Sequence, residues 1–484
     1  MITFEKNMNL DRVISESISV FCFFVLLTAC NESYVTLADS EVRGGVNGSC
    51  GVTRSDINEY GVSLKDAISF VDAHHFGEII EVKPYCEEND TLLYIFNFSK
   101  GWLLLSADKR VSPVLSSSYD GVFDLEEIPF GVSIWMKTEA DNIRYMRYHS
   151  PENDNEYTDL WARLLQSRYK PSFRKSSGEG RNIEKWYAVD LGYEEIGRSE
   201  LDYVPHLITT KWGQGYPWNF KCPVDTSLSP NVRCYLGCTA TACGQLLYYM
   251  HYYNDKPNDL YHSISCSKDY VNGSTYNIGF SRSNLVQNSS RWNSMAVNSS
   301  GSSVGIEYAG DLMLDVGNRF NMHYSGSGSG AWPNLSALYN YYNIAGISGN
   351  YNYFDVTSDL ISDRPVVIVA FSSTNPSSGH TWLIDGIHKT TVYYNHYKQF
   401  CYGEDWYLYS EYYDTWEEVR DQYNHLIQDP SETLILPWEY TYSFFLMNWG
   451  YDGLYDNGYY GLTSSWNVNG SDHAYNRIIY YDFQ

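Results

Sequence analysis

One stretch of sequence, residues 170–185 (KPSFRKSSGEGRNIEK), divides this chain more clearly than any other. It is polar, basic and glycine-containing, and it separates two regions whose apolar residues are patterned. Stretches of this composition usually join folded units. Because 484 residues also exceed what one hydrophobic core normally organises, we expect two folded regions, 31–185 with the linker at its end and 186–484, after a leader in residues 1–30.

The leader has the pattern of a signal peptide. Residues 20–27 (VFCFFVLL) form an apolar run that is too short to span a bilayer, and Lys6 and Arg12 precede it. The run ends in LTAC, residues 27–30, which resembles the bacterial lipobox, whose cysteine is lipidated and becomes the mature N-terminus. We therefore expect an exported bacterial protein with a lipid on Cys30, either secreted or held as a periplasmic or outer-membrane lipoprotein. A plain secretory signal cut a few residues later is the alternative.

Composition excludes several functions. A net charge of −25 without a basic stripe argues against nucleic acid as a partner. The cysteines outside the leader form no CxxC pair, so we expect neither a metal site nor another cofactor. The chain has 46 tyrosines, which we interpret as half-buried rings on strands, with glycan or peptide binding by exposed aromatics as the alternative.

The region before the linker alternates helix and strand patterns. The sequence predicts helices at 64–71, 132–148 and 157–169 and strands at 92–96 and 102–106. This order predicts a mixed α/β unit.

A cysteine at the start of a predicted helix is the first candidate catalytic group. Residues 237–250 (GCTATACGQLLYYM) follow a loop and repeat apolar residues at four-residue steps. Cys238 therefore lies at a helix N-terminus, where the peptide dipoles favour the thiolate and lower the pKa, as a nucleophile requires. A buried structural cysteine is the alternative.

A histidine and an asparagine on neighbouring strands complete a candidate triad. Residues 366–371 (VVIVAF) predict a buried strand whose hairpin partner begins near His380, and residues 444–447 predict a strand that ends at Asn448. His380 is placed to act as a base, and the Asn448 amide could accept its N–H and fix the tautomer. A structural histidine is the alternative.

Four motifs in this order resemble the streptopain family of secreted bacterial cysteine peptidases. They are WGQGYPWN (212–219), GCTATACGQLLYYMHYY (237–253), GHTWLIDG (379–386) and NWGYDG (448–453). The resemblance covers most of 205–484, and residues 94–114 are similar to the family's inhibitory propeptide. It implies an α+β, papain-like catalytic domain, in which a helix bearing the cysteine packs on an antiparallel sheet, after a smaller α/β propeptide domain.

The resemblance also implies residue roles. Cys238 would be the nucleophile, and His380 would take its proton and later protonate the leaving amine. Gln214 and the backbone N–H of Cys238 would stabilise the oxyanion, while Asn448 and Trp449 would orient and shield His380. Backbone groups would line the peptide-binding cleft, namely those of Ser329, Gly330 and Gly379.

Three features depart from the family pattern. Tyr451 stands where the family often has a second tryptophan, and Cys243 adds a thiol close to Cys238. A long acidic and aromatic insertion, residues 389–441, separates His380 from Asn448. It could form a lid or decorate an edge of the sheet.

The sequence thus predicts an exported cysteine endopeptidase that is made as a zymogen and acts on proteins or peptides. The N-terminal region would inhibit it in cis until the linker is cut. A cell-wall peptide amidase with a similar Cys–His pair is one alternative. An exported binding lipoprotein with a vestigial site and a tyrosine-rich binding surface is another.

Overall fold

The structure is a computed structural model of the chain. It describes residues 60–484 apart from 75, 88–89, 150–155, 166–182, 226–227, 229, 265–268, 272–273, 277–282, 372–378, 405–410, 462–466, 469–470 and 473–476. The predicted signal peptide, Cys30 and most of the predicted linker lie outside the described residues. No helix within the described ranges combines the length and low polarity needed to cross a bilayer.

In its described part, the region before the linker holds a four-stranded antiparallel meander and three helices. Its elements are α2 (Leu64–Ala73), β1 (Ile79–Glu87), β2 (Asp90–Phe98), β3 (Trp102–Ser106), β4 (Val114–Ser118), α3 (Phe130–His149) and α4 (Glu156–Leu165). Ser63 and Asp66 begin α2 with a capping box, which satisfies backbone N–H groups at the helix start. The predicted strands and the first two predicted helices are confirmed, and the third is confirmed up to Leu165, since residues 166–169 lie outside the described residues. Both faces of the meander are covered: α2 and α4 pack on one face and α3 on the other.

This meander continues into the large sheet of the second region. Within the described residues the sheet runs in the order β1-β2-β3-β4-β17-β16-β14-β13-β20-β12; β5 also pairs with β14, and β15 pairs with β5. The join is a short antiparallel pairing of β4 with β17 (Tyr459–Tyr460). The further strands are β12 (Ile347–Asn350), β13 (Val366–Phe371), β14 (Gly379–Gly403), β16 (Leu434–Asn448) and β20 (Arg477–Tyr481). One apolar cluster accordingly holds residues from both sides of the linker, among them Trp135 of α3, Trp382 and Trp449.

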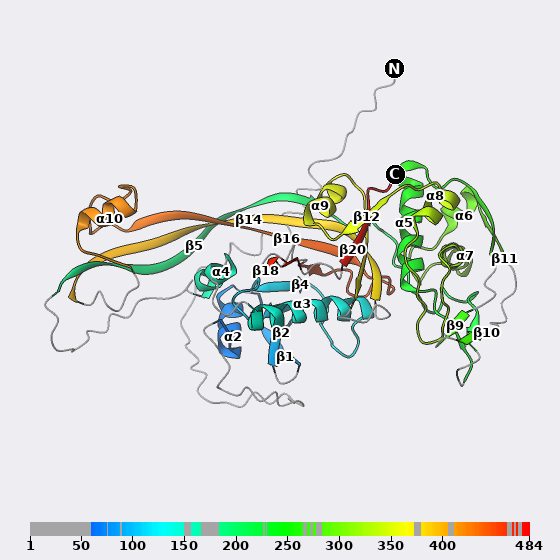
Figure 1. The fold of residues 1–484 in the computed structure, drawn as a ribbon, viewed down its shortest axis with the longest axis horizontal. Helices are drawn as coiled ribbons and strands as arrows, with labels where there is room; N and C mark the ends of the chain where they lie inside the picture. The colour runs from blue at the N-terminus through cyan, green and yellow to red at the C-terminus, as the bar shows by residue number, and fades with distance from the viewer. Residues whose placement is uncertain are drawn as a thin grey trace, which may run out of the picture. The chain divides into compact units, whose positions relative to one another are not determined.

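A helical layer packs on the other face of this sheet (Figure 1). It holds α5 (Cys238–Asn254), α6 (Ser289–Ser294), α7 (Ser303–Arg319) and α8 (Leu335–Tyr342). Helix α9 (Tyr353–Ile361) packs against β13 on the same face as α3. Small hairpins accompany it, made by β6 (Val224–Asp225), β7 (Val232–Arg233), β8 (Leu260–Ile264), β9 (Asp269–Val271), β10 (Ser274–Tyr276) and β11 (Ser283–Gln287). Gly244 lets α7 approach α5, since a Cβ there would lie 2.7 Å from Met313 Cγ. Helices packed on a large antiparallel sheet give the predicted α+β class.

The insertion at 389–441 extends the sheet. Strand β14 pairs with β5 (Lys185–Val204) through residues 387–403 and with β16 through residues 383–398, and the three strands form a ribbon that projects from the sheet (Figure 1). Its far end carries β15 (Tyr412–Tyr413), α10 (Trp416–Gln422) and a small core of its own around Phe400 and Val419. The insertion therefore extends an edge of the sheet, which is the second of its two predicted forms. The last hairpin pairs β18 (Asn467–Val468) with β19 (Ser471–Asp472).

Candidate active site

Cys238 is the first residue of α5, as predicted. The residue before it, Gly237, caps the helix with φ of +92°, a conformation that favours glycine. A Cβ at Gly237 would also approach Met322 and the Ser329 carbonyl to within 2.8 and 3.0 Å. A glycine is therefore required immediately before the thiol, and it fixes where the helix begins.

The environment of Cys238 favours the thiolate. Burial alone would raise the pKa of this thiol, but the charge of His380 and hydrogen bonds from His380 and Thr381 lower it to about 7. Burial instead raises the pKa of Cys243 far above its ordinary value, so that second thiol stays protonated and unreactive. Of these two thiols, only Cys238 has the electrostatics of a nucleophile.

His380 is held by a backbone carbonyl and by aromatic rings. It is the second residue of β14, is 1% exposed, and its Nε2 lies 3.1 Å from the Trp449 carbonyl oxygen. A carbonyl only accepts, so we assign the proton to Nε2, which leaves the other nitrogen to take the thiol proton. Trp382 and Tyr451 stack on the imidazole with centroid distances of 5.9 and 5.4 Å.

The predicted hydrogen bond between Asn448 and His380 is wrong. Asn448 Oδ1 accepts from Gln245 Nε2 at 2.9 Å, and Asn448 Nδ2 donates to the Thr210 carbonyl at 2.8 Å. Side chains alternate between the two faces of a strand. Asn448 pairs with Leu383, whose side chain packs on the α5 side of the sheet, so Asn448 also faces α5. His380 faces the opposite side of β14. Asn448 therefore ties the end of β16 to α5, and its neighbour Trp449 holds the imidazole through a backbone atom.

Gln214, the predicted oxyanion donor, lies near the segment before α5. Its carbonyl accepts from the Leu236 N–H at 2.9 Å, which joins its segment to the one that leads into Cys238. Its Nε2 is buried and has no hydrogen-bond partner of good geometry among the described residues. The Tyr451 phenol lies beside this side chain, and the Gln214 amide partly offsets the burial that raises the pKa of that phenol. A buried donor left in this state suits an oxygen that arrives only during reaction.

The loop expected to line the cleft is only partly available. Thr239 Oγ1 donates to the Ala331 carbonyl at 2.6 Å, so the loop lies against the start of α5. The Gly330 N–H donates to the His323 carbonyl at 3.1 Å, and the Gly330 carbonyl accepts from the His323 N–H at 3.0 Å. The expected open backbone at Gly330 is therefore corrected, since this pairing uses its N–H. Ser329 is buried, and Gly379 lies beside His380 at the start of β14.

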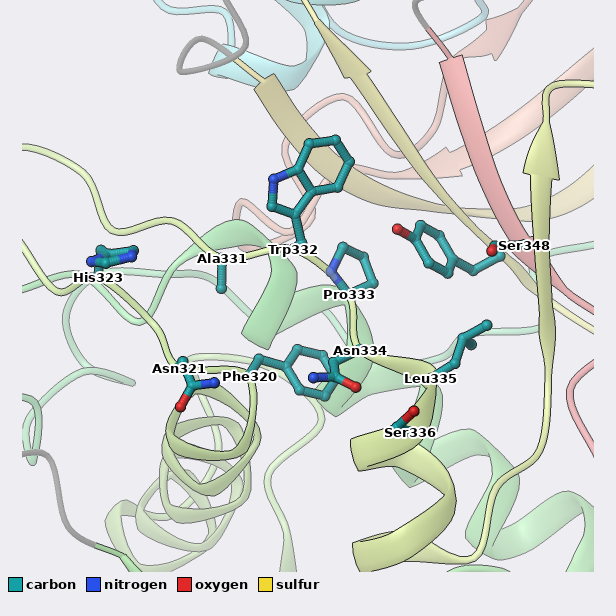
Figure 2. Close-up of a pocket in the computed structure, with 11 residues that line it drawn as sticks. Phe320, Asn321, His323, Ala331, Trp332, Pro333, Asn334, Leu335, Ser336 and Ser348 are labelled. Carbon is teal, nitrogen blue, oxygen red and sulfur yellow. The ribbon is translucent and has the colours of Figure 1, made fainter.

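A hollow of about 470 Å³ lies beyond this loop. Ala331 belongs to both the loop and the hollow, and Figure 2 shows the rings of Trp332, Pro333 and Phe320 at its walls. Its lining mixes these apolar groups with polar side chains, among them Asn321, His323 and Asn334. The hollow can hold a side chain, and its lining includes the imidazole of His323.

The start of α3, from the region before the linker, contacts the base. A Cβ on Gly131 would lie 2.5 Å from His380 Cδ2 and 2.8 Å from His380 Nε2. The Phe130 ring meets the imidazole edge-on at 5.9 Å, and the Phe130 N–H is directed at the Tyr451 phenol. Sequence reasoning missed this contact and those of Thr381 and the Trp449 carbonyl. Thr381 follows His380 in a motif already singled out, whereas nothing in the sequence marks Gly131.

The site combines a cysteine at a helix start, in surroundings that favour its thiolate, with a hydrogen-bonded imidazole on an antiparallel sheet. This combination defines a cysteine peptidase of papain-like α+β architecture. The family model of the Peptidase C10 family matches residues 212–460, half of the chain, and the chain belongs to that family. It is thus a cysteine-type peptidase, and the resemblance to streptopain is confirmed.

Two curated relatives are similar to this chain. The chain is 24% identical over 326 residues to the thiol protease/hemagglutinin PrtT of Porphyromonas gingivalis, covering 62% of this chain but only 32% of that protein. It is 23% identical over 325 residues to streptopain of Streptococcus pyogenes, covering 62% of this chain and 70% of that protein. Among structures, a fragment of Prevotella intermedia prointerpain A is similar with a TM-score of 0.47 and 18% identity, over 83% of this chain and 97% of the fragment. Active interpain A gives a TM-score of 0.35 and 19% identity, over 58% and 98%.

Proposed function

We propose that this peptidase is an exported endopeptidase of proteins or peptides that is made as a zymogen. The observation that carries the proposal is the contact of α3 with His380: a segment from before the linker lies against the base of the site. The segment that resembles a lipobox, ending at Cys30, supports export and a lipid anchor.

The chemistry follows from the arrangement of the site. His380 takes the Cys238 proton, and the thiolate attacks the scissile carbonyl, whose oxygen becomes negative. Gln214 Nε2 and the Cys238 N–H donate to that oxygen. The imidazolium then protonates the leaving amine, and water releases the acyl group by the reverse path. The Trp449 carbonyl supports this cycle, because it accepts from Nε2 in both protonation states of the ring.

Inhibition would be steric. With Phe130 and Gly131 against the imidazole, a substrate carbonyl has no route to the space between Cys238 and Gln214 from that side. A tethered inhibitor acts at a high effective concentration, and cutting the linker lets it dissociate. The proposed domain division, 31–185 and 186–484, places the cut in or near residues 170–185.

The test compares full-length wild type with Cys238→Ala, and uses Cys243→Ala as the matched control because its thiol is buried and protonated. The proteins are incubated at neutral pH under mild reduction, and their masses and casein hydrolysis are followed. We expect wild type and Cys243→Ala to shorten and become active, and Cys238→Ala to stay at full length and inactive.

Different failures would remove different parts of the proposal. A Cys238→Ala protein that matures and cleaves casein refutes the nucleophile. A wild type that is active while still full-length refutes only the zymogen. Mass spectrometry of the exported N-terminus tests the lipid separately, because an unmodified terminus away from Cys30 removes the anchor and leaves export intact.

A further inference from the structure

One face of the ribbon carries a row of aromatic rings. Side chains on a strand alternate, so Trp438, Tyr440, Tyr442 and Phe444 of β16 share a face, and all are half-buried. Neighbouring ring centroids along the row are 6.3, 6.3 and 5.5 Å apart. The catalytic chemistry uses none of these rings, although they account for part of the chain's high tyrosine and tryptophan content.

At one end of the row two rings form a cage. Trp438 and Tyr193 meet at 69° with centroids 6.0 Å apart, and we call this pair the arginine cage. Each wall is backed by another ring: Tyr394 packs on Trp438 at 5.0 Å, and His396 stacks on Tyr193 at 4.1 Å. Because three strands supply these rings, the cage is a fixed feature of the ribbon.

The cage holds a guanidinium in the intact chain. The Arg163 guanidinium carbon lies 4.4 Å from the Trp438 ring centroid and 5.7 Å from that of Tyr193. Its ion pair with Asp159 is long, at 4.0 Å, and that carboxylate is 74% exposed, so it contributes little. The aromatic faces are therefore the main attraction for this cation.

Arg163 belongs to the region that the proposed cleavage removes. It is on α4, which lies next to the ribbon (Figure 1). Trp161 of the same helix is buried in the N-terminal core and donates to the Val111 carbonyl at 2.9 Å. A cut between 166 and 185 would release α4 with this core and leave the cage walls in place.

We propose that the arginine cage is an exosite that binds an arginine side chain of a protein substrate in the processed enzyme. The planar guanidinium of Arg163 shows which chemistry the cage accepts. Residues 186–484, which would form the processed enzyme, hold 30 acidic against 14 basic side chains, and this excess favours cationic partners. The proposal rests on the proposed function, because the cage opens only when α4 leaves.

The distance between cage and nucleophile limits which substrates gain. His380 and Tyr394 are fourteen residues apart on β14, which is about 48 Å at about 3.4 Å per residue. Short peptides in the cleft cannot reach the cage. A protein substrate can occupy both sites, and the second contact raises its effective concentration at the cleft.

The first test uses the full, inactive chain, so it does not depend on processing. In Cys238→Ala/Arg163→Ala protein labelled with ¹⁵N-tryptophan, the Trp438 indole signal is identified as the one that Trp438→Phe removes. We expect ethylguanidinium to shift this signal saturably and ethylurea, its neutral analogue, to leave it in place. No shift, or equal shifts with both compounds, overturns the cage.

The second test uses enzyme that has processed itself. For Trp438→Ala we expect KM for casein to rise about two- to fivefold more than KM for a short fluorogenic peptide. The control Ile435→Ala removes an exposed side chain from the other face of β16 and should match wild type. Casein whose arginines are converted to citrulline should raise KM for wild type by the same factor, with no further rise in Trp438→Ala.

The outcomes separate the two proposals. If KM for casein does not change in Trp438→Ala, the cage serves only Arg163 and the exosite is refuted. If wild type never shortens, the zymogen proposal fails while the titration still decides the cage. If wild type shortens and the titration is flat, the cage alone fails.

Discussion

Replacing Gly131 with alanine tests the contact between α3 and the catalytic base most directly. The added Cβ would lie 2.5 Å from His380 Cδ2, 2.8 Å from His380 Nε2 and 2.8 Å from Trp449 Cε3, where ordinary contact begins near 3.4 Å. His380 is 1% exposed and Trp449 is fully buried, so neither ring has room to retreat. The start of α3 must therefore move away from the site.

The overlap sets the size of the effect. Overpacking in a close-packed site costs about 1 to 3 kcal/mol. Alanine also favours a helix over glycine by up to about 1 kcal/mol, but this gain is present whether α3 is docked or released and does not offset the clash. At a factor of ten per 1.4 kcal/mol, docking of the α3 start weakens by about 5- to 150-fold.

The assay is the lag before casein hydrolysis by full-length protein, with masses followed in parallel. We expect Gly131→Ala to shorten the lag and to give a product with the mass and kcat/KM of the wild-type product, because processing removes residue 131. The matched control is Gly197→Ala, whose Cβ would meet nothing within 4 Å. A lag equal to that of wild type would refute the idea that α3 restrains the site.

Four further predictions concern the site and its support. Burial raises the pKa of Cys238 and the charge of His380 lowers it, to about 7 on balance. The rate of Cys238 alkylation by iodoacetamide should therefore increase with pH with a midpoint near 7, and His380→Ala should move this midpoint upward. Gln214→Ala should lower kcat of the processed enzyme about 10²- to 10³-fold with little change in KM, as steady-state kinetics would reveal. Asn448→Ala should lower the free energy of unfolding in urea by about 1 to 3 kcal/mol by orphaning buried partners, and a large loss of kcat without this destabilisation would contradict its assigned place. Burial lowers the pKa of His206, but its buried carboxylate partner raises it to about 8. The stability that this pair contributes is therefore complete below about pH 6.5 and is lost as the pH rises through about 8. Because the His206 side chain is 34% exposed, the free energy of unfolding should fall by about 1 kcal/mol or less, and this fall should vanish in His206→Gln.

The sequence was sufficient for the parts of the site that local pattern determines. Glycine and small residues around Cys238 specify a helix start, and the run before His380 specifies a hairpin, so both groups were assigned by element and by role. The bond from His380 to the Trp449 carbonyl was beyond such reasoning, because every residue has a carbonyl. A side-chain amide next to it in sequence was the natural but mistaken choice.

The remaining features depend on contacts between distant segments. Gly131 meets His380 across about half of the chain, and neither residue's local sequence indicates the other. The insertion is similar in this respect. Its aromatic residues favour strands, but only the pairing of β14 with both β5 and β16 turns them into a ribbon with a row of rings on one face.

The join between the two halves of the sheet would also affect an enzyme processed as proposed. Only Tyr459 and Tyr460 of β17 pair with β4, opposite Ser117 and Ser116. This strand pairing is short, and β17 would become an edge strand if the N-terminal strands left as proposed. Open strand edges recruit other chains and cause aggregation. At two residues, β17 is too short to template such pairing, so release of the N-terminal strands would not create an aggregation-prone edge.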